Sequence, residues 1–188
     1  MITDPVPRSG MRRTVYGLSD AAPAIPLPSD DRLHTLALRM ESALSSGSTR
    51  AVRAACARFL TAAAQFYRVP EPNVRVLAAR PLRVYERGSA ELFGDYELKT
   101  MLIRVWMRTA VQRRVTSFGT FLSTLCHEFC HHLDLHMFGF SSTPHTRGFY
   151  QRTAVLYHHC RATPLRPLVW RRIGRGLWQV DWSRMARA

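Results

Sequence analysis

The spacing of apolar residues predicts two helices in the first third of the chain. The first follows Ser29-Asp30-Asp31, repeats apolar residues every three to four positions and ends near Gly47. The second begins at Ser48 or Thr49, either of which can cap a helix, and carries an apolar stripe at the same spacing. Pro70 stops this second helix, because proline cannot continue the backbone hydrogen bonds.

A change of period marks a region of strands after these helices. Residues 74–78 and 84–85 predict two short strands, and Gly88-Ser89 predicts a turn. The clearest strand prediction covers residues 100–106, where apolar and β-branched side chains dominate. Together these segments predict a small sheet, antiparallel or mixed.

Two further helices follow the strands. One begins at Thr116, is apolar over much of its circumference, as buried helices are, and ends by Gly139. Thr143-Pro144 has the signature of an N-cap followed by proline at the first helical position, and the helix it opens ends before Pro164. Two helices, a small sheet and two more helices form an α+β pattern.

Composition divides the chain into three parts. The 188 residues, 46% of them hydrophobic, suffice for one folded domain, which we place at residues 31–163. Residues 1–30 hold five of the eleven prolines and little periodicity, which predicts a mostly disordered lead-in. Residues 164–188 form a basic tail rich in Arg and Trp.

The chain is strongly basic, with 27 Lys and Arg residues against 13 acidic ones and a net charge of +14. All the basic residues except Lys99 are arginines, a bias that genome base composition alone can produce. The alternative is attraction to a polyanion such as nucleic acid. The tail can contact phosphates with its arginines and stack tryptophans on bases, or it can pack the tryptophans on the domain. Both interpretations stay open.

Three features favour the cytoplasm and no membrane partner. No stretch approaches the roughly 20 apolar residues that a membrane span needs. The first seven residues contain an acid and two prolines where a secretory signal has a basic and then an apolar region. The four cysteines, Cys56, Cys126, Cys130 and Cys160, are too scattered for a disulfide framework, which favours a reducing compartment.

The candidate chemistry lies in the third predicted helix, at His127-Glu128-Phe129-Cys130-His131. This H-E-x-x-H spacing places both histidines on one face of a helix, about 6 Å apart, so both imidazoles can bind one metal ion. Glu128 lies beside them, where it can take a proton from a metal-activated water. The motif predicts a Zn²⁺ site with His127 and His131 as ligands and Glu128 as general base.

A catalytic zinc usually has three protein ligands, and helix geometry ranks the candidates for the third. Asp134 and His136 lie about 10 Å and about 13 Å from His127 along a continuous helix, too far unless the helix breaks. His145 follows the turn expected at Gly139, and two antiparallel helices joined by a short loop bring it opposite the pair. We predict His145 as the third ligand, with His136 or Asp134 as alternatives. Asp134 is better suited to accept the free N–H of a ligand.

These residues resemble the SprT/Spartan-like group of minimal zincins and the related YgjP-like and WLM metallohydrolases. Members carry H-E-x-x-H on one helix and His-Gly-x-x-Phe on the next, and here His145-Thr146-Arg147-Gly148-Phe149 begins fourteen positions after His131. The resemblance spans roughly residues 95–157. Thr146 replaces the glycine of the group, and the C-terminal four-cysteine zinc ribbon of many members is absent. The resemblance implies a minimal zincin-like fold with zinc on the three histidines and Glu128 as base.

The resemblance also implies an intracellular zinc metalloprotease whose protein substrate pairs along the edge of the sheet. In Spartan-type proteins the substrates are proteins crosslinked to DNA. Arg147, Tyr150 and Tyr157 are candidates to stabilise the oxyanion. Two alternatives stay open: a zinc hydrolase with a non-protein substrate, and a nucleic-acid-binding module with a structural zinc. A structural zinc needs a fourth protein ligand, which would come from Cys130, His132, Asp134 or His136.

Overall fold

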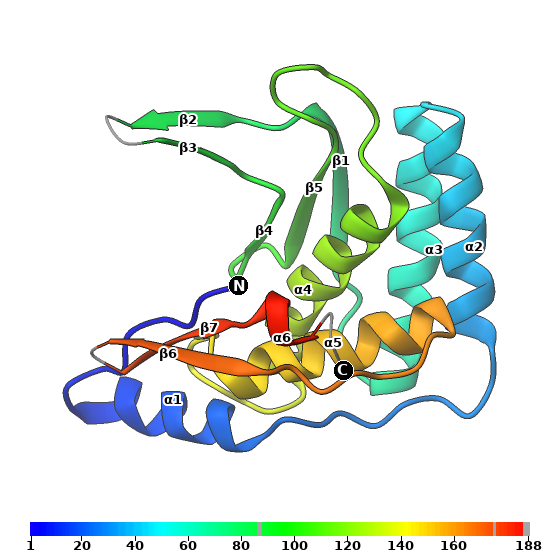
Figure 1. Cartoon of the computed structure of the whole chain (residues 1–188). Coiled ribbons are helices and arrows are strands. Elements are labelled where there is room, and N and C mark those ends of the chain that lie inside the picture. The colour runs from blue at the N-terminus through cyan, green and yellow to red at the C-terminus, as the bar shows by residue number, and fades with distance from the viewer. Residues whose placement is uncertain (86–87, 175, 186–188) are drawn as a thin grey trace.

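The structure is a computed structural model of the chain and describes residues 1–85, 88–174 and 176–185. Its helices are α1 (Gly10–Ala21), α2 (Arg32–Ser45), α3 (Thr49–Tyr67), α4 (Phe118–His136), α5 (Arg147–Arg161) and α6 (Trp182–Met185). Its strands are β1 (Asn73–Ala79), β2 (Leu82–Tyr85), β3 (Gly88–Glu91), β4 (Gly94–Glu97), β5 (Leu102–Arg108), β6 (Trp170–Gly174) and β7 (Leu177–Val180). The α+β class is confirmed, and Figure 1 shows α4 at the centre of the molecule. Within the described ranges, no helix has the length and apolar character needed to cross a membrane.

A mixed three-stranded sheet in the order β1-β5-β4 lies against the central helix. Strand β5 pairs in parallel with β1 and antiparallel with β4. Ile103, Val105 and Met107 of β5 have no exposed surface and alternate along the strand, because helices α3 and α4 cover that face of the sheet. Strand β4 therefore lies at an edge of this sheet, next to α4.

Strands β2 and β3 form a separate hairpin that extends from the body of the molecule (Figure 1). Gly88 and Ser89 pair with Tyr85 and Val84 as part of β3, so the turn predicted at these two residues is wrong. The predicted strand at 84–85 is confirmed, since both residues belong to β2.

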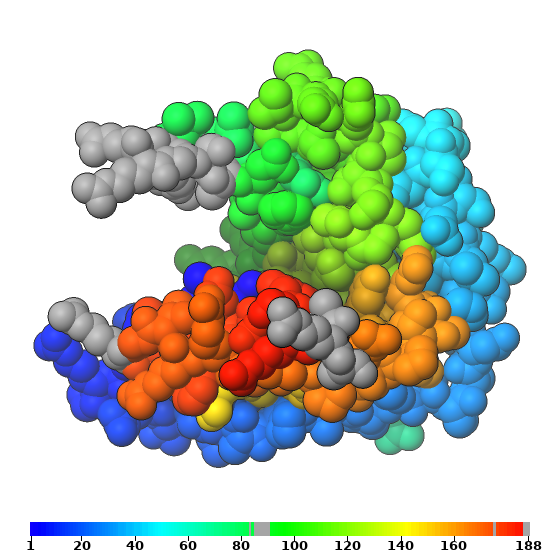
Figure 2. Space-filling model, viewed as in Figure 1, coloured from blue at the N-terminus to red at the C-terminus, as the bar shows by residue number. Residues whose placement is uncertain are grey.

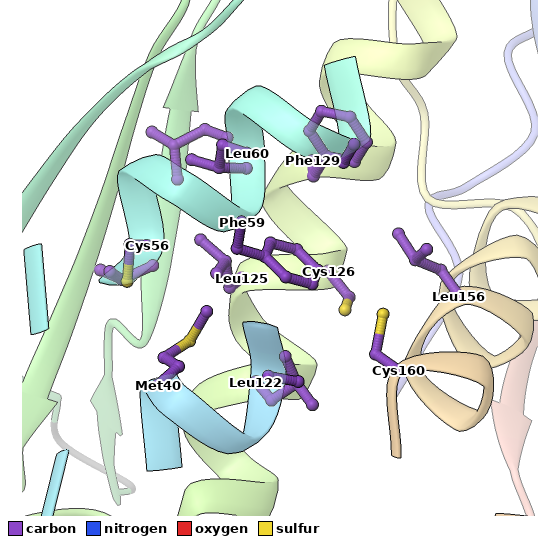
Figure 3. Packing of buried hydrophobic residues seen from close by; sticks show 14 of the residues in the cluster. Met40, Cys56, Phe59, Leu60, Leu122, Leu125, Cys126, Phe129, Leu156 and Cys160 are labelled. Carbon is purple, nitrogen blue, oxygen red and sulfur yellow. The ribbon is translucent and has the colours of Figure 1, made fainter. Parts of the chain in front are cut away.

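The apolar core lies where helices α2, α3, α4 and α5 meet. Figure 3 shows Phe59 of α3 packed between residues of α4 and α2, with Leu122 and Leu125 on the α4 side. All four cysteines are buried free thiols. Cys126 of α4 and Cys160 of α5 face each other in this core (Figure 3), so they act as small apolar residues where the two helices touch.

Helices α2, α3 and α4 confirm the sequence predictions with small shifts at their ends. Ser48 caps α3, because its side chain accepts the N–H of Ala51. Ser117 caps α4 in the same way by accepting the N–H of Thr120. The H-E-x-x-H motif therefore lies in the middle of a long, well-capped helix.

Helix α5 begins three residues later than the sequence indicated. Thr146 is its N-cap, since its hydroxyl accepts the N–H of Phe149 at 3.0 Å and lies 3.0 Å from the hydroxyl of Ser19. The prediction of an N-cap at Thr143-Pro144 is wrong. Residues 143 and 144 lie in the loop before the helix, where the hydroxyl of Thr143 contacts the ring of His131 on α4.

The N-terminal segment is part of the fold, which corrects the expected disordered lead-in. Residues 1–4 run beside β7 through backbone hydrogen bonds, among them the N–H of Thr3 to the carbonyl of Trp178 at 2.9 Å. Helix α1 then packs on α5, where Gly148 has no Cβ to collide with the carbonyl oxygen of Ser19. Pairing along a strand edge requires no apolar periodicity, so the sequence pattern did not reveal it.

The basic tail folds back on the domain as the β6–β7 hairpin and the short helix α6. The ring of Trp170 lies 5.9 Å from that of Tyr150, and the guanidinium of Arg147 lies 4.8 Å from the ring of Trp178. Two of the three tail tryptophans thus pack on the domain, while Trp182 stays 55% exposed. This arrangement matches the packing interpretation of the tail.

The buried side chain of Arg152 on α5 links three helices. Arg152 is 1% exposed and donates to the carboxylate of Asp134 at 2.7 Å, which links α5 to α4. The same guanidinium donates to the carbonyl of Ser19 at 2.9 Å and to that of Ala22, which links α5 to the end of α1. Asp134 therefore pairs with Arg152 and not, as predicted, with the N–H of a histidine ligand.

Removal of the positive charge from this pair is expected to destabilise the fold. Arg152→Met leaves the Asp134 carboxylate buried without its partner, which costs about 3–5 kcal/mol of unfolding free energy. Arg161→Met is the matched control, because Arg161 reaches Glu41 only at 4.0 Å near the surface, where a pair contributes about 1 kcal/mol or less. Urea unfolding followed by circular dichroism measures both variants. Equal stability of the two would contradict the role given to Arg152.

Candidate metal centre

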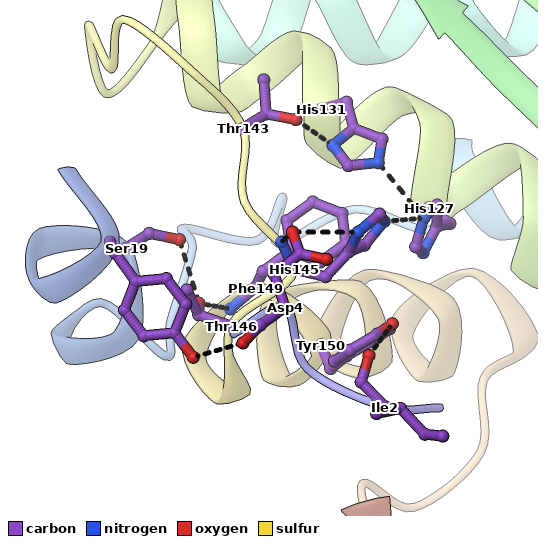
Figure 4. A network of polar contacts seen from close by, with 11 residues as sticks. Ile2, Asp4, Ser19, His127, His131, Thr143, His145, Thr146, Phe149 and Tyr150 are labelled. Carbon is purple, nitrogen blue, oxygen red and sulfur yellow. Dashed lines mark hydrogen bonds and ion pairs between the residues drawn. The ribbon is translucent and has the colours of Figure 1, made fainter. Parts of the chain in front are cut away.

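Three histidine rings from two segments of the chain meet at one point. His127 and His131 lie one turn apart on α4, and His145 comes from the loop that leads into α5 (Figure 4). The Nε2 atom of His127 lies 3.0 Å from Nε2 of His145 and 3.2 Å from Nε2 of His131. The ligand atoms of all three residues lie within 4.8 Å of one another. The structure thus brings together the three ligands that the sequence singled out.

These distances fit a metal ion held by three imidazoles. Zinc binds histidine nitrogen at about 2.0–2.1 Å, so neighbouring nitrogens of a tetrahedral site lie about 3.3 Å apart. Burial lowers the pKa of His127 to about 3 and lowers that of His131 as well, which keeps both rings neutral. The neutral imidazole is the form that donates a lone pair to a metal ion.

Contacts behind the rings determine where the nitrogens point. The hydroxyl of Thr143 contacts Nδ1 of His131, and the carboxylate of Asp4 lies 3.5 Å from Nδ1 of His145. Phe149 stacks on His131 with 4.4 Å between the ring centroids. Figure 4 shows the result: the Nδ1 atoms of these two ligands face the protein and their Nε2 atoms face His127.

Glu128 follows His127 on α4, lines the same cleft as His127 and is 5% exposed. Burial raises the pKa of its carboxyl to about 8, and the charge of Asp95 adds to the rise. A divalent cation in the cluster would favour the ionised carboxylate again. Strand β4 passes close to this side chain at Gly94, where a Cβ would come within 2.8 Å of Oε1 of Glu128. The missing side chain at Gly94 therefore leaves room for the carboxylate.

A cleft of about 850 Å³ opens over His127 and Glu128. Figure 2 shows the surface hollowed between the green residues that precede α4 and the red C-terminal elements. In a chain of net charge +14, no Arg or Lys is among the described residues that line this cleft. Most of its lining is apolar or aromatic, including Leu92, Phe93, Tyr157, Leu168, Trp182 and Met185.

The three candidates for stabilising an oxyanion lie in different surroundings. Tyr150 and Tyr157 both line the cleft. The hydroxyl of Tyr150 donates to the carbonyl of Ile2 at 2.9 Å. Arg147 is held by Asp20 at 2.5 Å and is not among the residues that line the cleft. The two tyrosines, and not the arginine, therefore border the cleft.

The residues considered as a fourth metal ligand have other partners. His132 lies between the hydroxyl of a tyrosine, 2.9 Å from Nδ1, and a backbone carbonyl, 2.8 Å from Nε2. His136 lies beside the same tyrosine, Cys130 is a buried core thiol, and Asp134 belongs to the ion pair with the arginine of α5. Among the residues that the structure describes, the metal-binding group has three members.

Sequence reasoning missed three residues of the site. Thr143 contacts a ligand ring and lies two positions before His145, so a search of that loop for hydroxyl groups would have found it. Gly94 is the first residue of β4, and nothing in the sequence shows that it approaches a carboxylate. Asp4 lies 141 positions from His145, and no sequence signal connects the two.

No family model, curated protein or solved structure matches this chain. The resemblance to SprT-like minimal zincins therefore rests on the motif residues alone. These are the H-E-x-x-H sequence on α4 and His145, which lies four residues before Phe149.

Proposed function

We propose that the protein is a zinc-dependent peptidase of the SprT-like type. The observation that carries the proposal is the convergence of His127, His131 and His145 beside the buried Glu128, at an open cleft. Catalytic zinc sites typically have three protein ligands and an open position, whereas structural zinc sites are closed by four. The three-membered group therefore supports the catalytic alternative over the structural one.

In this proposal the three histidines hold a zinc ion, which when bound supplies a Lewis acid that lowers the pKa of water and polarises a carbonyl group. Glu128 accepts a proton from the attacking water and passes it to the leaving amine. The carboxylate of Glu128 lies close to Gly94, in space that a larger residue there would need. Tyr150 and Tyr157 are the oxyanion candidates because both line the cleft. The hydroxyl of Tyr150 would have to release the carbonyl of Ile2 before it could donate to an oxyanion.

The lining of the cleft favours a protein substrate over a nucleic acid. A nucleic-acid strand needs basic groups for its phosphates, and the described residues of the lining include no Arg or Lys. The apolar and aromatic lining suits side chains of an unfolded protein segment. Strand β4 lies at the sheet edge beside Glu128, so an extended peptide can add to the sheet there.

A second candidate function is contact with nucleic acid outside the cleft. It is supported by the net charge of +14 and by exposed arginines such as Arg171 and Arg172 on β6. Such a contact would bring the peptidase to DNA-associated proteins.

A zinc hydrolase for a non-protein substrate would use the same residues, and only the choice of substrate separates it from a peptidase. We also propose a cytoplasmic location, because four buried free thiols suit a reducing compartment.

Glu128→Gln is expected to lower the hydrolysis of an unfolded protein substrate such as casein by about 100-fold or more, the usual contribution of a general base. Bound zinc should stay at the wild-type level, since the three histidines are unchanged. Glu41→Gln, on the far helix α2, is the control and should keep full activity. Peptide release and elemental analysis measure the two quantities. Full activity in a zinc-loaded Glu128→Gln variant would contradict the assigned role.

Gly94→Ala is expected to misplace the same carboxylate without changing it. The added methyl group would lie 2.8 Å from Oε1 of Glu128 and 2.6 Å from Cγ2 of Thr124, so a neighbour has to move. A misplacement of about 1 Å can lower catalysis about 100-fold. The matched control is Gly17→Ala on α1, where the methyl group meets no atom within 4 Å. If Gly94→Ala hydrolyses the substrate as fast as Gly17→Ala, the close approach of Gly94 to the Glu128 carboxylate has no role in hydrolysis.

A further inference from the structure

A carboxylate from the first residues of the chain reaches the third histidine of the metal centre. Oδ2 of Asp4 accepts the backbone N–H of His145 at 2.8 Å and lies 3.5 Å from Nδ1 of the same ring (Figure 4). The backbone N–H of Asp4 donates in turn to the carbonyl of His145 at 2.8 Å. One backbone hydrogen bond and one from the backbone of His145 to the Asp4 carboxylate thus hold the two residues together and place the carboxylate beside the ring.

The position of Asp4 is fixed by two further elements of the fold. Its carbonyl oxygen accepts the hydroxyl of Tyr16 on α1 at 3.2 Å. The preceding residue, Thr3, donates its N–H to the carbonyl of Trp178 at 2.9 Å and accepts the N–H of Trp178 on its hydroxyl at 3.0 Å. Asp4 is therefore held between α1 and β7, with its side chain directed at the His145 ring.

His145 needs such a partner more than the other two ligands do. The backbone of His127 and His131 belongs to α4, whose hydrogen bonds set the direction of both side chains. His145 lies before the N-cap Thr146, outside any helix or strand. Its Nε2 atom nevertheless lies 3.0 Å from Nε2 of His127, so something other than secondary structure directs the ring.

We propose that Asp4 is a positioning residue of the metal centre: it orients the His145 ring and holds the ring proton on Nδ1, which leaves Nε2 free to bind the metal. A neutral imidazole carries one N–H, and a carboxylate next to Nδ1 keeps it there. The inference rests on the metal centre of the proposed function and does not depend on peptidase activity.

The chain offers a matched control in Asp20. Asp20 accepts the backbone N–H of Arg147 at 3.0 Å, just as Asp4 accepts that of His145, two residues earlier. It also pairs with the guanidinium of Arg147 at 2.5 Å. Asp20→Asn therefore removes the charge, keeps an oxygen that can accept the N–H of Arg147, and leaves the partner of the His145 ring in place.

The test is the zinc affinity of the full chain, measured by competition with a chromophoric chelator, for wild type, Asp4→Asn, Asp4→Ala and Asp20→Asn. Loss of a partner behind a metal ligand lowers metal affinity about 10- to 100-fold. We expect this loss in Asp4→Ala, a smaller loss in Asp4→Asn, whose amide oxygen can still accept from Nδ1, and wild-type affinity in Asp20→Asn. With cobalt in place of zinc, the visible absorption bands should change in Asp4→Ala and stay the same in Asp20→Asn.

Two results would overturn the proposal. One is wild-type zinc affinity in both Asp4 variants. The other is an equal loss in Asp4→Ala and Asp20→Asn, which would assign the effect to the turn and not to the ring. If Asp4→Ala fails to fold, Asp4→Asn carries the comparison, because it has nearly the same shape. A graded loss supports the proposal even if the wild type hydrolyses no peptide, because affinity and spectrum are read with the metal alone.

Discussion

The metal centre depends on how firmly the turn before α5 is held against α4. His127 and His131 are placed by one helix, but His145 reaches them from a loop, and a small movement of that loop would separate the three nitrogens. Several contacts hold the loop. Thr146 caps α5, and its hydroxyl lies within hydrogen-bond distance of the hydroxyl of Ser19 on α1. The buried ion pair between Arg152 and Asp134 joins α5 to α4. The geometry of the centre is therefore a property of the packing of α1, α4 and α5 together.

The buried scaffold and the cleft differ in how they use charged residues. The arginines that the fold buries have structural partners, as Arg152 does with Asp134. The cleft lining in the described part of the chain includes no Arg or Lys, although the net charge is +14. Among the described lining residues no basic side chain lies beside the carboxylate of Glu128, and burial together with the charge of Asp95 raises its pKa.

Local patterns predicted the parts of this fold that depend on local physics. The helical periodicity, the cap at Ser48 and the β-branched residues of β5 each act within a few residues, and so does the H-E-x-x-H spacing that places His127 and His131 on one face. His145 was also predicted, because the loop length limits where the chain can return. The start of α5 was misplaced since Thr143 and Thr146 are both suitable caps, and tertiary contacts choose between them.

The features that escaped prediction depend on residues far apart in the sequence. Residues 1–4 gain their structure from hydrogen bonds to β7, which no periodicity records. The length of an unbroken helix placed Asp134 too far from His127 to share a metal ion with it. The partner that Asp134 does have, Arg152, lies on the next helix. Asp4 is the extreme case, because its contact with His145 joins the first residues of the chain to the loop before α5, 141 positions away.

The most direct test of this account is the zinc content of wild type and His145→Ala, purified side by side and measured by elemental analysis. The account predicts about one zinc per chain in the wild type and a large loss in the variant. The far-UV circular dichroism of the two proteins should be the same, because His145 lies outside the helices. No zinc in the wild type after reconstitution, or equal zinc in both proteins, would contradict a centre built on three histidines.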